Sequence, residues 1–188
     1  EIEPQVTWGT SPEMVVSVNG TIPDPALEQD ASRRESIMQS LKYMGLQGGS
    51  AIKDIKLDTI FIGSCTNSRL SDLRRAANIL RGQRVAAGVR AICVPGSMSV
   101  KRAAEAEGLD QVFRDAGFEW RESGCSMCFF AGGESFGEQE RVVSSTNRNF
   151  ESRQGPQTRT HLASPETVAA SAVAGHLIDF RRLTSEVI

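Results

Sequence analysis

The sequence has no strong imbalance of charge and no long apolar run. Its 188 residues carry 21 lysines and arginines against 23 aspartates and glutamates, a formal net charge of −2. Binding to nucleic acid or to an anionic membrane surface depends on clustered positive charge, so the composition favours neither partner. No apolar stretch approaches the length of a bilayer crossing. No basic leader followed by an apolar core stands at the start, so nothing predicts secretion.

Cysteine is also scarce. Four cysteines in a chain of this size are too few for a disulfide scaffold. Cys93 lies in an apolar run over residues 89–94 and is interpreted as a small buried hydrophobic residue of an interior strand. Cys65, Cys125 and Cys128 stand instead beside glycine and serine in turn-like sequence, where a ligand can approach. Unprotected thiols indicate a reducing compartment, either the cytoplasm or an organelle matrix.

What is present is typical of a globular protein: 39% of the residues are hydrophobic and 23% are charged. Residues 1–50 are predicted to be an irregular lead-in, because prolines recur through its first half. One helix is expected there, over residues 28–43, where apolar residues have helical spacing. Residues 51–188 are predicted to form the main domain, because regular segments follow one another from there on.

In this main domain, strand-like and helix-like segments alternate. Strands are predicted at residues 57–63, 89–94 and 118–121, and helices at 71–82, 100–107, 109–116 and from Ser164 to Gly175. This order predicts an α/β fold of three layers, α/β/α, with a mostly parallel sheet. Ligand sites in such folds lie beyond the carboxyl ends of the strands. Cys65 and the pair Cys125 and Cys128 fall at two of these ends.

Spacing alone leaves three kinds of site open for the cysteines. Three thiolates, from Cys65, Cys125 and Cys128, can hold an iron–sulfur cubane that keeps one iron without a protein ligand. A structural zinc ion needs a fourth ligand, and Cys93 and His161 are the candidates, although neither has a partner at a characteristic spacing. A redox dithiol at Cys125 and Cys128 would leave Cys65 without a role. The spacing ranks these three interpretations about equally.

Two arginines, Arg148 and Arg153, stand five positions apart in a polar segment. Isolated surface arginines are usually solvated and contribute little. A polar loop, rather than a helix face with scattered charge, favours bidentate recognition of a carboxylate. The two histidines, His161 and His176, have no neighbouring carboxylate in the sequence, so no catalytic residue is predicted. His161 is interpreted as a partly buried, hydrogen-bonded imidazole.

Several short motifs occur along the chain in a fixed order. They are residues 8–12 (WGTSP), 63–69 (GSCTNSR), 124–128 (GCSMC), 147–150 (NRNF), 159–162 (RTHL) and 163–166 (ASPE). Together they resemble the large-subunit family of 3-isopropylmalate dehydratases, in the aconitase superfamily. The resemblance implies an aconitase-like iron–sulfur domain. It also implies that the chain is the carboxy-terminal part of a longer large subunit.

The resemblance further implies roles for individual residues. Cys65, Cys125 and Cys128 would ligate a [4Fe-4S] cluster with one iron free of protein ligands, whereas Arg148 and Arg153 would bind the carboxylates of a small hydroxy dicarboxylate. Asn147 would lie beside the cluster. The family reaction is that of a hydro-lyase, which moves a hydroxyl group between adjacent carbons and converts 2-isopropylmalate to 3-isopropylmalate in leucine biosynthesis.

The same resemblance implies that the chain holds only part of an active site. In the family the general base is a serine on a swivelling domain, which a small subunit supplies in a heterodimer. Two departures from the usual pattern leave the substrate open: phenylalanines follow Cys128, and Ser152 stands where glycine is common. A paralogue acting on homoaconitate, methylmalate or dimethylmalate, or a non-catalytic metal-binding regulatory module, is the alternative. Asn67 is interpreted either as a donor to cluster sulfur or as a turn residue.

Overall fold

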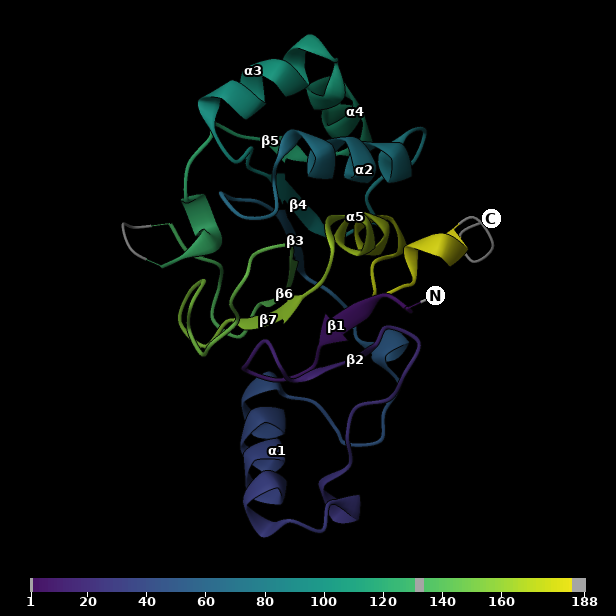
Figure 1. Cartoon of the computed structure of the whole chain (residues 1–188), viewed down its shortest axis with the longest axis vertical. Helices are drawn as coiled ribbons and strands as arrows, with labels where there is room; N and C mark the ends of the chain where they lie inside the picture. The colour runs from purple at the N-terminus through teal and green to yellow at the C-terminus, as the bar shows by residue number, and fades with distance from the viewer. Residues whose placement is uncertain (1, 131–133, 184–188) are drawn as a thin grey trace.

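The computed structural model of the chain describes residues 2–130 and 134–183 (Figure 1). The β-strands are β1 Gln5–Thr7, β2 Val15–Ser17, β3 Thr59–Ile62, β4 Arg90–Cys93, β5 Glu119–Trp120, β6 Arg141–Ser144 and β7 Arg159–Leu162. The α-helices are α1 Ala31–Met44, α2 Leu70–Leu80, α3 Met98–Ala106, α4 Leu109–Ala116 and α5 Pro165–Ala174. Short 3₁₀ turns are η1 Pro25–Leu27, η2 Ile52–Asp54, η3 Ser126–Cys128 and η4 Phe180–Arg182.

Five strands form one parallel sheet in the order β5-β4-β3-β6-β7. The chain runs from β3 outward to β4 and β5, and then returns to the other side of β3 to add β6 and β7. The strand order therefore reverses between β3 and β6, and open α/β sheets bind ligands beyond the carboxyl ends of the strands at such a point. The predicted α/β class and the parallel sheet are confirmed.

The two faces of the sheet are covered differently. Ile60, Ile62 and Val143 belong to the main core, which also contains buried hydrophobic residues of α2, α3, α4 and α5. Figure 1 shows α2 and α5 lying over this face. Phe61 and Val142 alternate with them along the strands and belong to a second, smaller core.

Loops and the 3₁₀ turn η3 cover the second face, where the sequence predicted a layer of α-helices. Met127, Cys128 and Phe136, from the connection between β5 and β6, complete the small core there. Crossover connections between parallel strands are right-handed. Connections that lead to the next strand on one side therefore cover one face of the sheet, and connections that lead the other way cover the opposite face. The returning connections, from β5 to β6 and from β6 to β7, contain no α-helix in the described residues. The cysteine turn therefore packs directly on the sheet.

The ends of the helices follow local capping chemistry. Helix α2 begins where the Asp72 carboxylate accepts from the Arg69 amide at 3.1 Å, one residue before the predicted start at residue 71. Helix α4 has the predicted bounds and ends at Gly117, whose φ of 102° is left-handed. Helix α5 is capped by Ser164, as predicted. Among the described helices, none combines the length and the apolar character that a bilayer crossing needs.

Two short antiparallel strands in the first fifty residues were not predicted from the sequence. Strand β1 pairs with β2, and Val6 also forms an antiparallel bridge to Ala163, just after β7. Val6 and Trp8 are buried in the main core. Helix α1 agrees with the expected helix to within a few residues and lies at the end of the molecule farthest from α3 (Figure 1). The division into two parts at residue 50 stays a prediction.

His161 joins β7 to β1 and β6 as a neutral imidazole. The ring is fully buried, and its Nδ1 lies 2.7 Å from the carbonyl oxygen of Thr7 while its Nε2 lies 3.1 Å from Nη1 of Arg141. A carbonyl can only accept and a guanidinium can only donate, so Nδ1 carries the proton and Nε2 accepts. Burial, and secondly the positive charge of Arg141, lowers the pKa of His161 to about 3.

This buried histidine should make the stability of the chain fall with acidity. Below an ordinary pKa of about 6.5 the unfolded chain binds a proton on His161 that the folded chain does not bind. The free energy of unfolding should therefore fall by up to about 1.4 kcal/mol per pH unit as the pH drops from roughly 6.5 toward 4. Urea unfolding at about pH 7, 6 and 5 measures this slope. His161→Gln should flatten it, and an equal slope in both proteins would contradict the assignment.

Candidate metal and substrate site

All six residues predicted to form a site lie at the carboxyl edge of the sheet. Cys65 follows β3, the pair Cys125 and Cys128 follows β5, and residues 147–153 follow β6. These strands are parallel, so their carboxyl ends meet at the same edge. The predicted placement of the cysteines beyond strand ends is thus confirmed. Strands β3 and β6 are adjacent, and they flank the point where the strand order reverses.

The Cys65 loop is fastened to the end of β6 by Ser145. The buried hydroxyl of Ser145 accepts from the amide of Gly63 at 3.1 Å and lies 3.1 Å from the Gly63 carbonyl oxygen and 3.3 Å from that of Asn67. The Asn67 side-chain amide donates to the Ser145 carbonyl at 2.7 Å. Asn67 therefore stabilises the loop, in agreement with its interpretation as a turn residue. The Cys65 thiol projects from this loop and is exposed.

The second pair of thiols lies on the 3₁₀ turn η3. The amide of Cys128 donates to the carbonyl of Cys125 at 2.9 Å, which closes the turn. Ser126, between them, has a left-handed φ of 43°. Cys125 is exposed, whereas Cys128 is 8% exposed because it packs into the small core together with Met127. The two thiols thus point into different surroundings.

Arg153 contacts this cysteine turn directly. Its Nε donates to the carbonyl oxygen of Cys128 at 3.0 Å, and its Nη2 lies 3.6 Å from the Cys128 sulfur. The guanidinium carbon lies 5.3 Å from the ring centre of Phe150 and 5.9 Å from that of Phe129, within the range of cation–π attraction. The structure therefore brings Arg153 and Cys128 together and places the guanidinium near two aromatic rings. Sequence reasoning assigned neither ring a role.

Asn147 and Arg148 are exposed at the tip of the same loop, and the described residues offer their side chains no hydrogen bond. The residue that anchors the loop is Asn149, which the sequence did not single out. It is buried, and its side-chain amide donates to the Gly9 carbonyl at 2.7 Å and to the Thr7 hydroxyl at 3.2 Å. In the motif NRNF it is the buried residue between the exposed Arg148 and Phe150, and no local pattern in the sequence announced that it anchors the loop.

The left-handed backbone at Ser152 explains why glycine is favourable there. Ser152 has a φ of 61°, which a residue with a Cβ adopts at some cost. Its hydroxyl accepts from the amide of Gln157 at 3.1 Å, and its own amide donates to the Tyr43 hydroxyl at 2.7 Å. These hydrogen bonds offset part of the conformational cost. The serine therefore keeps the loop geometry that a glycine would adopt freely.

The three candidate ligands are free thiols. Among the described residues, no three Cys, His, Asp or Glu side chains converge closely enough to hold a metal ion. A single zinc ion requires such convergence. An iron–sulfur cluster would take thiolates as its donors, and Cys65, Cys125 and Cys128 would be the residues to hold it. Three free thiols at one edge of the sheet are the donor set that a cluster needs.

The two candidates for a fourth zinc ligand are unsuitable. Cys93 is fully buried in β4, where burial raises the pKa of its thiol well above the usual value. His161 is fully buried as well, and both of its ring nitrogens already have hydrogen-bond partners. Neither residue is therefore placed to complete a closed tetrahedral zinc site with the three loop cysteines. The interpretation of Cys93 as a small buried hydrophobic residue is confirmed.

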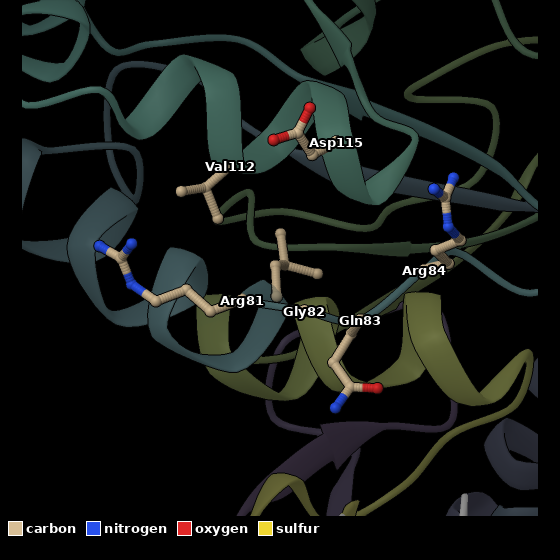
Figure 2. A pocket seen from close by; sticks show the side chains of 7 residues that line it. Arg81, Gly82, Gln83, Arg84, Val112 and Asp115 are labelled. Atoms are coloured by element: carbon tan, nitrogen blue, oxygen red, sulfur yellow. The ribbon is translucent and has the colours of Figure 1, made fainter.

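A hollow far from the cysteines, shown in Figure 2, is not part of this site. It has a volume of about 390 Å³ and is lined mainly by the residues after α2 and by α4. The end of α2 leads into the start of β4, so the hollow lies at the amino edge of the sheet. Figure 2 shows Arg81 and Arg84 pointing to opposite sides of it, so their charges do not converge on one ligand.

A groove of about 460 Å³ lies nearer to the candidate site, and Asn67 and Thr146 are among its lining residues. These residues follow β3 and β6, on either side of the reversal in strand order. The groove therefore runs along the carboxyl edge beside the Cys65 loop. The first turns of α2 and α5 also border it, since Arg69 and Ser164 line its wall.

The structure is thus a parallel α/β domain that carries free thiols and a loop with two arginines at the carboxyl edge of its sheet. The profile of the aconitase family (aconitate hydratase) matches residues 1–175, so the chain belongs to this family. One relative is the 3-isopropylmalate dehydratase large subunit of Cupriavidus necator, which is 67% identical over 182 residues. The match covers 97% of this chain and 68% of that relative.

Proposed function

We propose that the chain is the cluster-binding part of a 3-isopropylmalate dehydratase large subunit. Such a hydro-lyase moves a hydroxyl group between adjacent carbons of a branched hydroxy dicarboxylate, from 2-isopropylmalate to 3-isopropylmalate in leucine biosynthesis. The observation that carries the proposal is the 67% identity to a large subunit of that name along 97% of this chain. The gathering of the motif residues at one edge of the sheet supports it.

Cys65, Cys125 and Cys128 are the proposed ligands of a [4Fe-4S] cluster with one iron free of protein ligands. When bound, the cluster supplies a Lewis acid that polarises the bond between carbon and the departing hydroxyl group. The chain contributes three thiols on two fastened loops. Arg153 places its Nη2 3.6 Å from the Cys128 sulfur, so a positive charge lies beside one of the proposed ligands.

Arg148 and Arg153 are the proposed carboxylate-binding residues, with Asn147 placed beside the cluster. Nε and Nη2 of Arg153 face the cysteine turn, and its Nη1 makes no hydrogen bond to the described residues. The Nη1 side of the guanidinium can therefore meet a substrate carboxylate. The rings of Phe129 and Phe150 restrict the orientation of the guanidinium plane. Arg148 offers a second, exposed guanidinium on the same loop.

The proposed partner is a small subunit, as the large-subunit name of the relative suggests. It would supply the swivelling domain and the general base in a heterodimer, since no residue described here is assigned as a base. The near balance of 21 basic and 23 acidic residues offers no support for a nucleic-acid partner. Free thiols at an exposed loop fit a reducing compartment, so we place the enzyme in the cytoplasm or an organelle matrix.

The test is the activity of the complete complex, with the large and small subunits assembled without air, on a panel of hydroxy diacids. We expect 2-isopropylmalate to exceed homoaconitate, methylmalate and dimethylmalate in kcat/KM by roughly tenfold or more, because one methylene in an apolar pocket is worth about 1–3 kcal/mol. Faster turnover of another diacid would instead identify a paralogue. No turnover by a fully iron-loaded complex would favour a regulatory metal-binding module.

A further inference from the structure

Gln154 is buried beneath the cysteine turn and uses both ends of its side chain there. Its exposed fraction is 0%. Its Nε2 donates to the carbonyl oxygen of Met127 at 2.9 Å, and its Oε1 accepts from the hydroxyl of Thr160 at 2.8 Å. Met127 lies between the two cysteines of the turn, and Thr160 lies in the edge strand β7. One amide therefore connects the turn to the sheet.

Backbone hydrogen bonds run beside this side chain. The Gln154 carbonyl accepts from the amide of Phe136 at 3.0 Å, and the Arg153 carbonyl accepts from the amide of Phe130 at 2.6 Å. The arginine loop and the segment that follows the cysteine turn are thus paired at two points. Gln154 extends this pairing to the turn itself, through the carbonyl of Met127.

The cysteine turn cannot fix its own position. It has three residues and is closed by one amide hydrogen bond, from Cys128 to Cys125. A single 3₁₀ turn has poor hydrogen-bond geometry and little intrinsic stability. A buried amide that loses a partner leaves a donor or acceptor unsatisfied. Breaking either hydrogen bond of the Gln154 side chain would therefore cost free energy. The position of the turn must therefore come from contacts of this kind.

We propose that Gln154 is a positioning residue, which fixes the Cys125–Cys128 turn against β7 and keeps the Cys128 thiol at a constant place. It acts through the carbonyl of Met127 and touches no ligand itself. If a cluster binds, as the proposed function holds, the same contact would also slow the loss of iron from it. The contact between Gln154, Met127 and Thr160 is present in the chain whether or not a cluster binds.

The first measurement is the rate at which iodoacetamide alkylates each cysteine in the iron-free chain, mapped by mass spectrometry of peptides. Gln154→Glu keeps an acceptor for Thr160 but puts a carboxylate oxygen against the Met127 carbonyl. Cys128 is 8% exposed, so its alkylation requires the turn to open. We expect it to react about tenfold faster or more in Gln154→Glu, while Cys65 reacts at an unchanged rate.

A second pair of variants separates positioning from general stability. Thr160→Val removes the other hydrogen bond with little change of shape and should also speed the alkylation of Cys128, whereas Thr160→Ser restores the hydroxyl and should return the rate close to that of the original chain. Leu80→Ala, in the core at the amino edge, lowers stability without touching the turn. Leu80→Ala is compared with Gln154→Glu and Thr160→Val under conditions that give a similar free energy of unfolding. If it speeds the alkylation of Cys128 equally, the positioning role is wrong.

The third measurement uses the chain loaded with iron and sulfide without air. Visible absorption followed after addition of an iron chelator should decay several-fold faster in Gln154→Glu than in the original chain, and Thr160→Ser should decay at the original rate. Unchanged alkylation of Cys128 in both Gln154→Glu and Thr160→Val would overturn the proposal. If the original chain itself took up no cluster, the proposed function would fail, and the alkylation rates would still decide the role of Gln154.

Discussion

Replacing Cys65, Cys125 or Cys128 with serine is expected to abolish the broad visible absorption of the chain after anaerobic loading with iron and sulfide. A serine hydroxyl is a poor substitute for a thiolate, and a cubane held by only two protein ligands would be lost. Iron and sulfide analysis beside the absorption spectrum measures the effect. The loss should be nearly complete for each of the three variants.

Cys93→Ser is the control for this series. Cys93 is fully buried in β4 and belongs to the main core, whereas the Cys128 turn packs in the smaller core on the other face of the sheet. The variant should keep its absorption and its iron content, although it should be less stable because a hydroxyl replaces a buried thiol. If the original chain were colourless and contained stoichiometric zinc after careful anaerobic preparation, the cluster assignment would be wrong. Equal loss in Cys93→Ser would point to misfolding as the cause.

Arg153→Lys is expected to lower kcat/KM of the complete complex about a hundredfold, equivalent to roughly 3 kcal/mol of transition-state binding. Lysine keeps the charge but loses the planar guanidinium, which can face the cysteine turn through Nε and Nη2 and a carboxylate through Nη1 at the same time. It also loses the stacking of the guanidinium on Phe150 and Phe129. The cluster absorption should remain, because no guanidinium is a ligand. Arg148→Lys should lower kcat/KM as well.

The matched control is Arg102→Lys. Arg102 is exposed on α3, carries no predicted role in the site, and its replacement should leave kcat/KM unchanged. Arg141, on β6, would be a poor control. Its guanidinium donates to the Met44 carbonyl at 2.7 Å, and burial lowers its pKa to about 10. If Arg148→Lys and Arg153→Lys were both as active as the control, both loop arginines would have to be interpreted as solvated surface charges without a role in substrate binding.

The parts of the fold that the sequence predicted are those with local signals. Helix α4 lies between Gly108 and Gly117, both left-handed, and its predicted bounds agree with the structure. Strand β3 was visible as an apolar run that ends before Gly63. The positions of Cys65 and of the Cys125 turn followed from the rule that sites lie beyond strand ends, which needs only the order of the elements.

The unpredicted parts depend on contacts between distant residues. Gln154 and Met127 are 27 positions apart, and Arg153 and Cys128 are 25 apart, so no local pattern announces either pair. Strands β1 and β2 have three residues each, too few for a clear alternation of apolar and polar side chains. The cover of the second sheet face is a loop whose packing depends on Met127 and Phe136, and loops carry little periodic signal.

The pairing of β1 with the far end of the chain has a consequence for the order of synthesis. Thr7 and Gly9 accept from His161 and Asn149, which lie 154 and 140 positions later. Contacts of such separation close only after nearly the whole segment has left the ribosome, and they are slow to form. The thiol loops therefore emerge before the arginine loop can be anchored. The carboxyl edge of the sheet is therefore complete only after β7 has emerged and paired with the residues around β1.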